Sequence, residues 1–148
     1  MDLSQPHALP YIAGFFDGEG SIGIYLNGKK HGRTLRVQLT QTVTPQSTEL
    51  MTALRDRWGG SLCPYNKALR RPAWNWQVSA ASGYAFLLEV RPYLLLKADQ
   101  ADVALTWWAN RALPRRGPDG RRMPMPPETR TADEVAERAL KELKAAAA

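Results

Sequence analysis

The chain has 148 residues, enough for one domain with a substantial core, a hydrophobic content of 44% and a formal net charge of +6. No apolar run is long enough to cross a membrane, and the N-terminus lacks the basic-then-apolar pattern of a signal peptide. Cys63 is the single cysteine, which excludes an intrachain disulfide and a cysteine-based zinc site. These features favour an intracellular globular protein.

The positive charge is concentrated in two segments. Residues 29–71 carry a net +7 and residues 111–130 a net +4, whereas the first 28 residues carry −3. A basic body around a small acidic centre suits a metal-dependent nuclease, because cations attract phosphates and carboxylates hold the metal. A solvated basic surface would give the same counts, so the charge alone leaves nucleic-acid binding undecided.

Alternating apolar and polar residues, helix-capping pairs and glycine stops predict a regular series of elements up to residue 111. In chain order they are a helix from Ser4 or Pro6 through Phe16 that ends at Gly18 and Gly20, strands at 21–27 and 33–41, a helix from Thr44-Pro45 to Gly59-Gly60, strands at 61–67 and 73–79, and helices at 82–90 and 95–111.

The remaining segment is rich in Arg and Pro up to residue 130 and has no periodicity, so we expect a loop there. Thr131 and Glu134 have the spacing of a capping box, which predicts a helix to about Lys144. The order αββαββα with an extra C-terminal helix predicts an α+β domain with a four-stranded, mostly antiparallel sheet. The expected organisation is a core at 1–112, a loop at 113–130 and a C-terminal helix within 131–148.

The first predicted helix ends in the sequence IAGFFDGEG, at residues 12–20. Its small residues let a second backbone approach closely, but its two acids lie at a helix C-terminus, where negative charge opposes the helix dipole. A bound cation or hydrogen bonds from a neighbouring loop would compensate. We interpret Asp17 as a structural acid that bonds backbone near the helix end. Glu19, just past the helix, is the better metal ligand, since Mg²⁺ takes one or two protein carboxylates. The alternative, a plain helix end with surface acids, fits these charges poorly.

This stretch resembles the LAGLIDADG motif of homing endonucleases, which it matches at the Ala-Gly pair, both acids and the final glycine. The resemblance covers roughly residues 8–112 and implies a homing-endonuclease-like fold whose sheet binds DNA. It implies that Glu19 and the backbone carbonyl of Gly18 hold a divalent cation beside the scissile phosphates. That cation is Mg²⁺, with Mn²⁺ or Ca²⁺ as alternative occupants.

The motif occurs once, without an internal repeat. In this family the motif helices of two subunits pack side by side, so one copy supplies half of the interface and one main carboxylate. The resemblance therefore implies a homodimer. The implied interface residues are Ala13, Gly14, Asp17 and Gly18.

Two further segments resemble the family. Residues 91–101 resemble a segment in which a lysine precedes a helix with Gln-Ala, so Lys97 falls where the active-site lysine lies, with an electrostatic role. The alternative is a solvated lysine at a helix start. The end of the second predicted strand resembles a region where a glutamine positions water, which indicates Gln41 or, as fallback, Gln46. The family often has a basic residue where this chain has residues 48–50, and none of these three is basic. The resemblance therefore assigns no arginine to the active site here.

The outward faces of both predicted hairpins are rich in side chains that can contact DNA. Arginine and glutamine read base edges bidentately in the major groove, which admits a β-ribbon, although a solvated sheet face is the common alternative. The candidates are Tyr25, Asn27, Lys29, Lys30, Arg33, Arg36, Gln38, Thr40, Tyr65, Lys67, Arg70, Arg71, Asn75 and Gln77.

The resemblance implies a site-specific double-strand DNA endonuclease that acts as a homodimer on a long pseudo-palindromic site. It implies metal-assisted phosphodiester hydrolysis that leaves 3′ overhangs and promotes intron or intein homing. The partners are double-stranded DNA and a second copy of the chain, with no membrane. The alternatives are a non-cleaving RNA maturase or DNA-binding regulator on the same fold, and a structural dimer module that would leave the hairpin charge unexplained.

Overall fold

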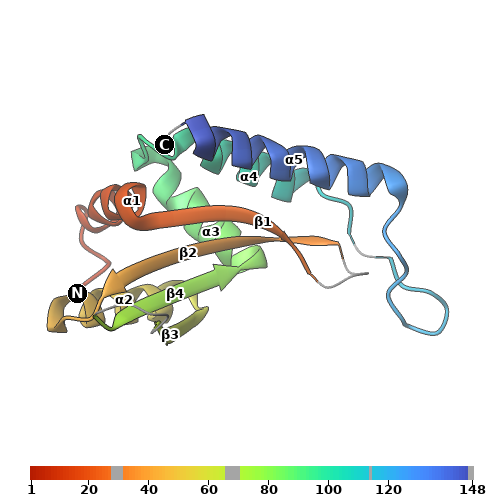
Figure 1. Ribbon diagram of the computed structural model, residues 1–148. Coiled ribbons are helices and arrows are strands. Elements are labelled where there is room, and N and C mark those ends of the chain that lie inside the picture. The colour runs from red at the N-terminus through yellow and green to blue at the C-terminus, as the bar shows by residue number, and fades with distance from the viewer. Residues whose placement is uncertain (28–31, 66–70, 114, 147–148) are drawn as a thin grey trace.

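A four-stranded antiparallel sheet with helices packed on one face forms the body of the protein (Figure 1). The structure is a computed structural model that describes residues 1–27, 32–65, 71–113 and 115–146. The sheet order is β1-β2-β4-β3, which confirms the expected α+β class and antiparallel sheet. The elements are α1 (Ala8–Glu19), β1 (Gly20–Leu26), β2 (Arg33–Thr42), α2 (Pro45–Trp58), β3 (Ser61–Tyr65), β4 (Ala73–Ser79), α3 (Ala80–Val90), the 3₁₀ turn η1 (Arg91–Tyr93), α4 (Ala98–Asn110) and α5 (Pro127–Ala146).

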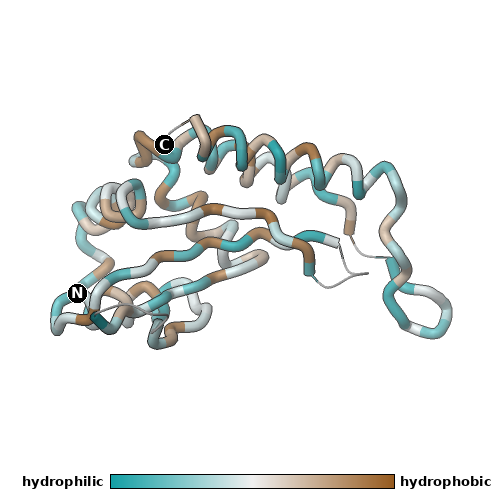
Figure 2. Tube along the Cα trace, in the orientation of Figure 1, coloured by the Kyte–Doolittle hydropathy of each residue, from teal (hydrophilic) through white to brown (hydrophobic). Residues whose placement is uncertain are grey.

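The core lies between the sheet and the helices because the strands alternate buried apolar side chains with polar ones, as Figure 2 shows along the Cα trace. Val37 of β2 lies between Ile22 of β1 and Val78 of β4, and all three are at most 1% exposed. A period of two then turns the intervening polar residues to the opposite face of the sheet. Among the described residues, no helix has the length and apolar character needed to cross a bilayer.

Aromatic rings fix α1 and the sheet relative to each other. The ring of Phe86, on α3, meets Phe16, Trp58 and Trp76 edge-on, with ring centroids 5.1–5.2 Å apart. Each such contact stabilises a core by about 0.5–1.5 kcal/mol beyond the area it buries. Since these rings come from α1, α2 and β4, the position of α1 is set by the same cluster that holds the sheet.

Helix α1 runs directly into β1 through Gly20. A Cβ atom at Gly20 would lie 2.1 Å from the Phe16 ring, so only glycine fits at this junction. The expectation that Gly18 and Gly20 both stop the helix is wrong at Gly18, because the helix continues through it to Glu19. Glu19 is therefore the last residue of α1 rather than the residue after it.

Helix α2 begins as expected. Thr44 is its N-cap and forms a capping box with Ser47, in which the Ser47 amide donates to the Thr44 hydroxyl at 3.0 Å. Pro45 occupies the first turn, where its missing N–H costs nothing. Gly59 closes the helix with φ of +75°, a left-handed conformation that glycine adopts without strain.

Helix α5 begins at Pro127, four residues before the predicted start at Thr131. The Thr131 hydroxyl donates to the Pro127 carbonyl at 3.0 Å, so Thr131 lies inside the helix and is not its cap. Proline suits the first helical turn, a signal that the capping-box interpretation overlooked. The loop between α4 and α5 is correspondingly shorter than residues 113–130.

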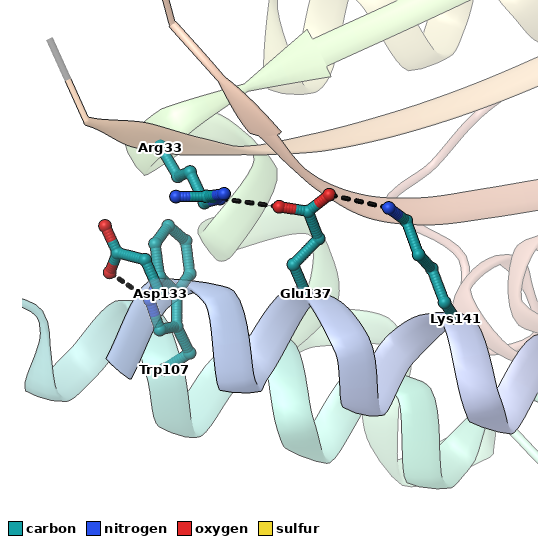
Figure 3. Close-up of polar contacts among 5 residues, drawn as sticks. All are labelled: Arg33, Trp107, Asp133, Glu137 and Lys141. Atoms are coloured by element: carbon teal, nitrogen blue, oxygen red, sulfur yellow. Dashed lines mark hydrogen bonds and ion pairs between the residues drawn. The ribbon is translucent and has the colours of Figure 1, made fainter. Parts of the chain in front are cut away.

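Helix α5 lies along α4 and beside β1, so it belongs to the same body as the sheet (Figure 1). Its Leu140 is 2% exposed and belongs to the core. Figure 3 shows two polar links that hold it: Trp107 Nε1 donates to Asp133 Oδ1 at 2.9 Å, and Arg33 Nε donates to Glu137 Oε2 at 2.6 Å.

Candidate functional site

The exposed face of α1 carries two glycines. Tyr11, Gly14 and Gly18 recur at helical spacing on this open face. A Cβ atom at Gly14 or Gly18 would meet nothing within 4 Å among the described residues, although glycine inside a helix costs about 1 kcal/mol relative to alanine. The packing of the protomer therefore gives no reason for either glycine. Ala13, expected in the same interface, is 0% exposed and lies in the core, because it falls on the opposite side of the helix.

Asp17 is 7% exposed, and its carboxylate receives three backbone amides from the turn before α4. Oδ2 accepts from Leu95 N at 2.7 Å and from Leu96 N at 3.1 Å, and Oδ1 accepts from Lys97 N at 2.9 Å. Hydrogen bonds to a charged acceptor are roughly twice as strong as neutral ones. Asp17 thus ties the last turn of α1 to the start of α4, which is the bonding to backbone that we expected of this acid, from a segment far away in sequence.

The same contact brings Lys97 to the end of α1. The Lys97 ammonium donates to the backbone carbonyl of Asp17, two residues before Glu19. The Glu19 carboxylate is exposed and makes no hydrogen bond or ion pair with any described residue. The unpaired Glu19 carboxylate and the hydrogen-bonded Lys97 ammonium therefore lie at the same helix terminus.

The oxygen donors at this terminus fit part of a magnesium site. The Glu19 carboxylate and the Gly18 carbonyl are hard oxygen ligands, and the last carbonyls of a helix lack an intrahelical donor and carry partial negative charge. Within the described part of the chain, no three His, Cys, Asp or Glu side chains come together. At this terminus one protomer supplies the Glu19 carboxylate and backbone carbonyls.

The polar face of the sheet consists of paired side chains on neighbouring strands. Gln38 Nε2 donates to Gln77 Oε1 at 3.1 Å, and one register step away Thr40 Oγ1 donates to Asn75 Oδ1 at 3.2 Å. These amides and hydroxyls retain further donors and acceptors that point away from the helices.

At the β1 side of the same face, the Arg36 guanidinium lies 4.8 Å from the centroid of the Tyr25 ring. Its Nε atom is buried and has no hydrogen-bond partner among the described residues. A Cβ atom at Gly23 would lie 2.2 Å from the Tyr25 ring, so the ring fits there because Gly23 has no side chain. The Arg36 guanidinium therefore lies against Tyr25 on the sheet surface and keeps hydrogen-bond donors that no described residue uses.

Sequence comparison finds no matching family model and no matching curated protein. Solved structures do match. The homing endonuclease I-CvuI, in complex with the I-CreI target, aligns with a TM-score of 0.71 at 16% identity over 96% of this chain and 85% of that one. The meganuclease I-SmaMI, bound to DNA, aligns with a TM-score of 0.54 at 18% identity over 93% of this chain but 43% of that one. The LAGLIDADG homing endonuclease I-GzeII, in complex with its DNA target, aligns with a TM-score of 0.53 at 18% identity over 68% of this chain.

The fold is that of the LAGLIDADG homing endonucleases. The expected resemblance is confirmed at the level of the fold. This chain spans less than half of the I-SmaMI chain and 35% of the I-GzeII chain, while it spans most of one I-CvuI chain.

On this homing-endonuclease fold, the two glutamine candidates line one hollow beside α1. Gln41 and Gln46 border an open hollow of about 630 Å³ together with His7, Tyr11 and Phe15. The side chain of Gln41 accepts a hydrogen bond from the Thr42 amide at 2.9 Å. Both remain candidates for positioning water.

Apart from the residues of this polar sheet face, the expected DNA contacts divide into three groups. Arg33 is wrong as a sheet-face contact, because it shares the parity of Leu35 and Val37 and its guanidinium bonds Glu137 on the helix side. Asn27 and Arg71 are exposed at strand ends, and Tyr65 lies opposite Ala73 at the end of β3. Lys29, Lys30, Lys67 and Arg70 lie outside the described residues.

The structure adds residues that the motifs did not indicate. Leu95 and Leu96 are 85% and 75% exposed, beside the end of α1 to which Asp17 ties them. Lys144, near the end of α5, also lies close to the site: burial lowers the pKa of its ammonium, and the charges of Lys97 and Lys141 lower it further. The signal for Lys144 was absent from the sequence, since only the packing of α5 along α4 brings it there.

Proposed function

We propose that this chain is a homodimeric, site-specific double-strand DNA endonuclease of the LAGLIDADG type. The observation that carries the proposal is the end of α1. An exposed, unpaired Glu19 follows an open glycine face, and Lys97 is held at the same terminus by Asp17. The homing-endonuclease fold supports the same assignment.

The dimer would form through the open faces of two α1 helices. Gly14 and Gly18 let the backbones approach closely, and Leu95 and Leu96 would extend the contact at one end. Two-fold symmetry would then bring two copies of Glu19 together at the centre. That arrangement explains why one protomer offers an incomplete set of carboxylates.

Glu19, its mate and the Gly18 carbonyls would hold Mg²⁺, or Mn²⁺ or Ca²⁺ in its place. When bound, the cation supplies a Lewis acid and lowers the pKa of water at the scissile phosphate. Lys97 stabilises charge on the phosphate, and its ammonium is positioned by the Asp17 carbonyl before DNA arrives. Gln41 or Gln46 orients water beside the end of α1.

Each polar sheet face would lie in the major groove of one half-site. Arg36, Gln38 and Gln77 can form bidentate contacts with purine edges, while the other polar residues contact phosphate or water. A dimer of two such faces reads a long pseudo-palindromic site. Cleavage of both strands would leave 3′ overhangs and promote homing of an intron or intein.

A selection for cleaved duplexes from a random palindromic library in Mg²⁺ tests this proposal. We expect recovery of one two-fold symmetric site, with both strands cut, and sedimentation of the protein as a dimer on that duplex. Recovery of no cleaved duplex, or a monomer on the recovered site, would contradict it.

One observation favours a non-cleaving binder as the second candidate. The early turns of α2 hold no basic residue, and Glu49 there pairs with the N-terminal ammonium of Met1. A maturase or regulator of this kind would bind nucleic acid in the same experiments and cut none of it.

A further inference from the structure

Between α4 and α5 the chain forms an ordered hairpin with the sequence RRGPDGRR at residues 115–122, which we call the arginine loop. Arg116 and Arg122 pair as an antiparallel bridge. The Gly120 amide donates to the Gly117 carbonyl at 2.9 Å, and Gly120 has φ of +76°, a conformation that glycine adopts without strain. The arginine loop is therefore a turn with an ordered backbone.

The arginine loop holds more positive charge than its own acid can balance. Arg115, Arg116, Arg121 and Arg122 are all exposed, and Asp119 is the one acid among these eight residues. Asp119 Oδ2 lies 3.7 Å from Arg121 Nε, which leaves the other three without a carboxylate partner among the described residues. Arg116 Nη1 donates to the Gly120 carbonyl at 2.8 Å within the loop, and the like charges of Arg116 and Arg122 lie opposite each other across the bridge, which is unfavourable. An anion shared by these side chains would remove that repulsion.

The position of the arginine loop bears on which anion it binds. It projects beyond the end of the sheet that is opposite α1, on the side where β1 ends and β2 begins (Figure 1). Met125, three residues after the loop, borders a hollow with Leu26, Gly32 and Arg33, so the chain that follows the loop lies near the ends of β1 and β2. Figure 2 shows that much of this loop is hydrophilic.

We propose that the arginine loop binds the phosphates of duplex DNA outside the segment that the sheet contacts. This inference rests on the proposed function: if DNA runs along the sheet away from α1, the arginine loop is the next surface that it meets. Arginine binds phosphate through two parallel N–H donors, and such contacts carry no sequence information. In a two-fold dimer the two arginine loops would lie at the two outer ends of the site.

The test compares two double variants with the same change in charge. Arg116→Gln with Arg122→Gln removes two charges from the arginine loop, and Arg55→Gln with Arg138→Gln removes two exposed charges from α2 and α5. Binding is measured against salt on the duplex recovered by the cleavage selection, with and without flanks of about one helical turn, or about 10 bp, at each end. Circular dichroism checks that both variants are folded.

We expect the loop variant to weaken binding to the flanked duplex by about 10-fold or more at low salt. Each phosphate contact that is lost should reduce the slope of log K against log salt by about 0.9. The unflanked duplex and the control variant should show little change, and hydroxyl-radical footprints of the wild type should extend into the flanks. Equal effects of the two variants, or an effect on duplex RNA rather than DNA, would overturn the inference.

These outcomes are separable from the proposed endonuclease. If the wild type cuts its site and the loop variant binds the flanked duplex normally, the inference fails and the endonuclease stands. If no duplex is cut, the same salt titrations on an arbitrary flanked duplex still measure the contribution of the arginine loop.

Discussion

Asp17 makes two kinds of contact with one turn of chain. Its carboxylate accepts three amides from Leu95, Leu96 and Lys97, and its backbone carbonyl accepts the Lys97 ammonium. The first contact fixes the turn, and the second fixes the side chain that the proposed chemistry uses. We therefore propose that Asp17 is a positioning residue, that Glu19 holds the cation and that Lys97 meets the phosphate.

Replacing Asp17 by Asn should destabilise the fold by about 1–3 kcal/mol, because an amide oxygen cannot accept all three backbone donors. The free energy of unfolding from urea titration measures the loss. Asp99→Asn, at an exposed position in the first turn of α4, is the matched control and should cost less than about 1 kcal/mol. Equal losses at the two positions would contradict the structural role of Asp17.

Lys97→Met should keep the aliphatic stem and remove the charge. We expect a cleavage rate lower by about 10²-fold, in the range found when one electrostatic contact to a transition state is removed, with DNA affinity within a few-fold of wild type. Single-turnover cleavage and equilibrium binding on the selected duplex separate the two effects. A rate near wild type would remove Lys97 from the site.

Helix α5 shows what the sequence could and could not predict at the scale of an element. Its existence follows from local signals, but its docking does not, because Trp107, Asp133, Arg33 and Glu137 meet only through packing of segments far apart in sequence. The error at Arg33 has the same origin. The strands were predictable because alternation is local, whereas the partner of an arginine at a strand end is set by whichever helix lies beside it.

Hydrogen bonds from Lys141 and Arg33 hold the pKa of Glu137 below its ordinary value. A carboxyl whose pKa is lowered by folding contributes stability above its unfolded pKa and loses it as the pH falls through the folded pKa. We therefore expect Glu137→Gln to cost about 1–3 kcal/mol at neutral pH, since it removes the charged partner of Arg33, and to flatten the loss of stability in acid.

Thermal unfolding of Glu137→Gln from neutral to acidic pH measures both effects. Lys141→Gln is the control, because Lys141 is 73% exposed and its pair with Glu137 is an ordinary i,i+4 contact worth about 0.3–0.5 kcal/mol. An acid profile in Glu137→Gln that matches wild type would show that the link to Arg33 contributes nothing.

At the scale of the molecule, we propose different roles for the two ends of the sheet. The α1 end carries the glycine face, Glu19 and Lys97. The arginine loop lies beyond the opposite end of the sheet (Figure 1). The motif was sufficient to predict the fold, and it predicts that the chemistry occurs at the end of α1. The sequence showed the positive charge of residues 111–130 but predicted only an irregular loop there. The hydrogen bonds within the backbone show that part of this loop is an ordered turn.

Gly14→Leu tests the proposed dimer. Since a Cβ atom at Gly14 meets nothing within 4 Å, the protomer should keep its circular dichroism spectrum, and leucine favours the helix by up to about 1 kcal/mol over glycine. The dimer on DNA should dissociate and cleavage should fall with it. A folded variant that still sediments as a dimer on DNA would place the interface elsewhere.

The most direct measurement is the cleavage rate of Glu19→Gln on the selected duplex in Mg²⁺, with affinity measured in parallel. We predict a rate lower by at least about 10²-fold, because the amide no longer supplies negative charge to the cation, with affinity within a few-fold of wild type. A Glu19→Gln protein that cuts both strands at the wild-type rate would contradict a site built from two α1 termini.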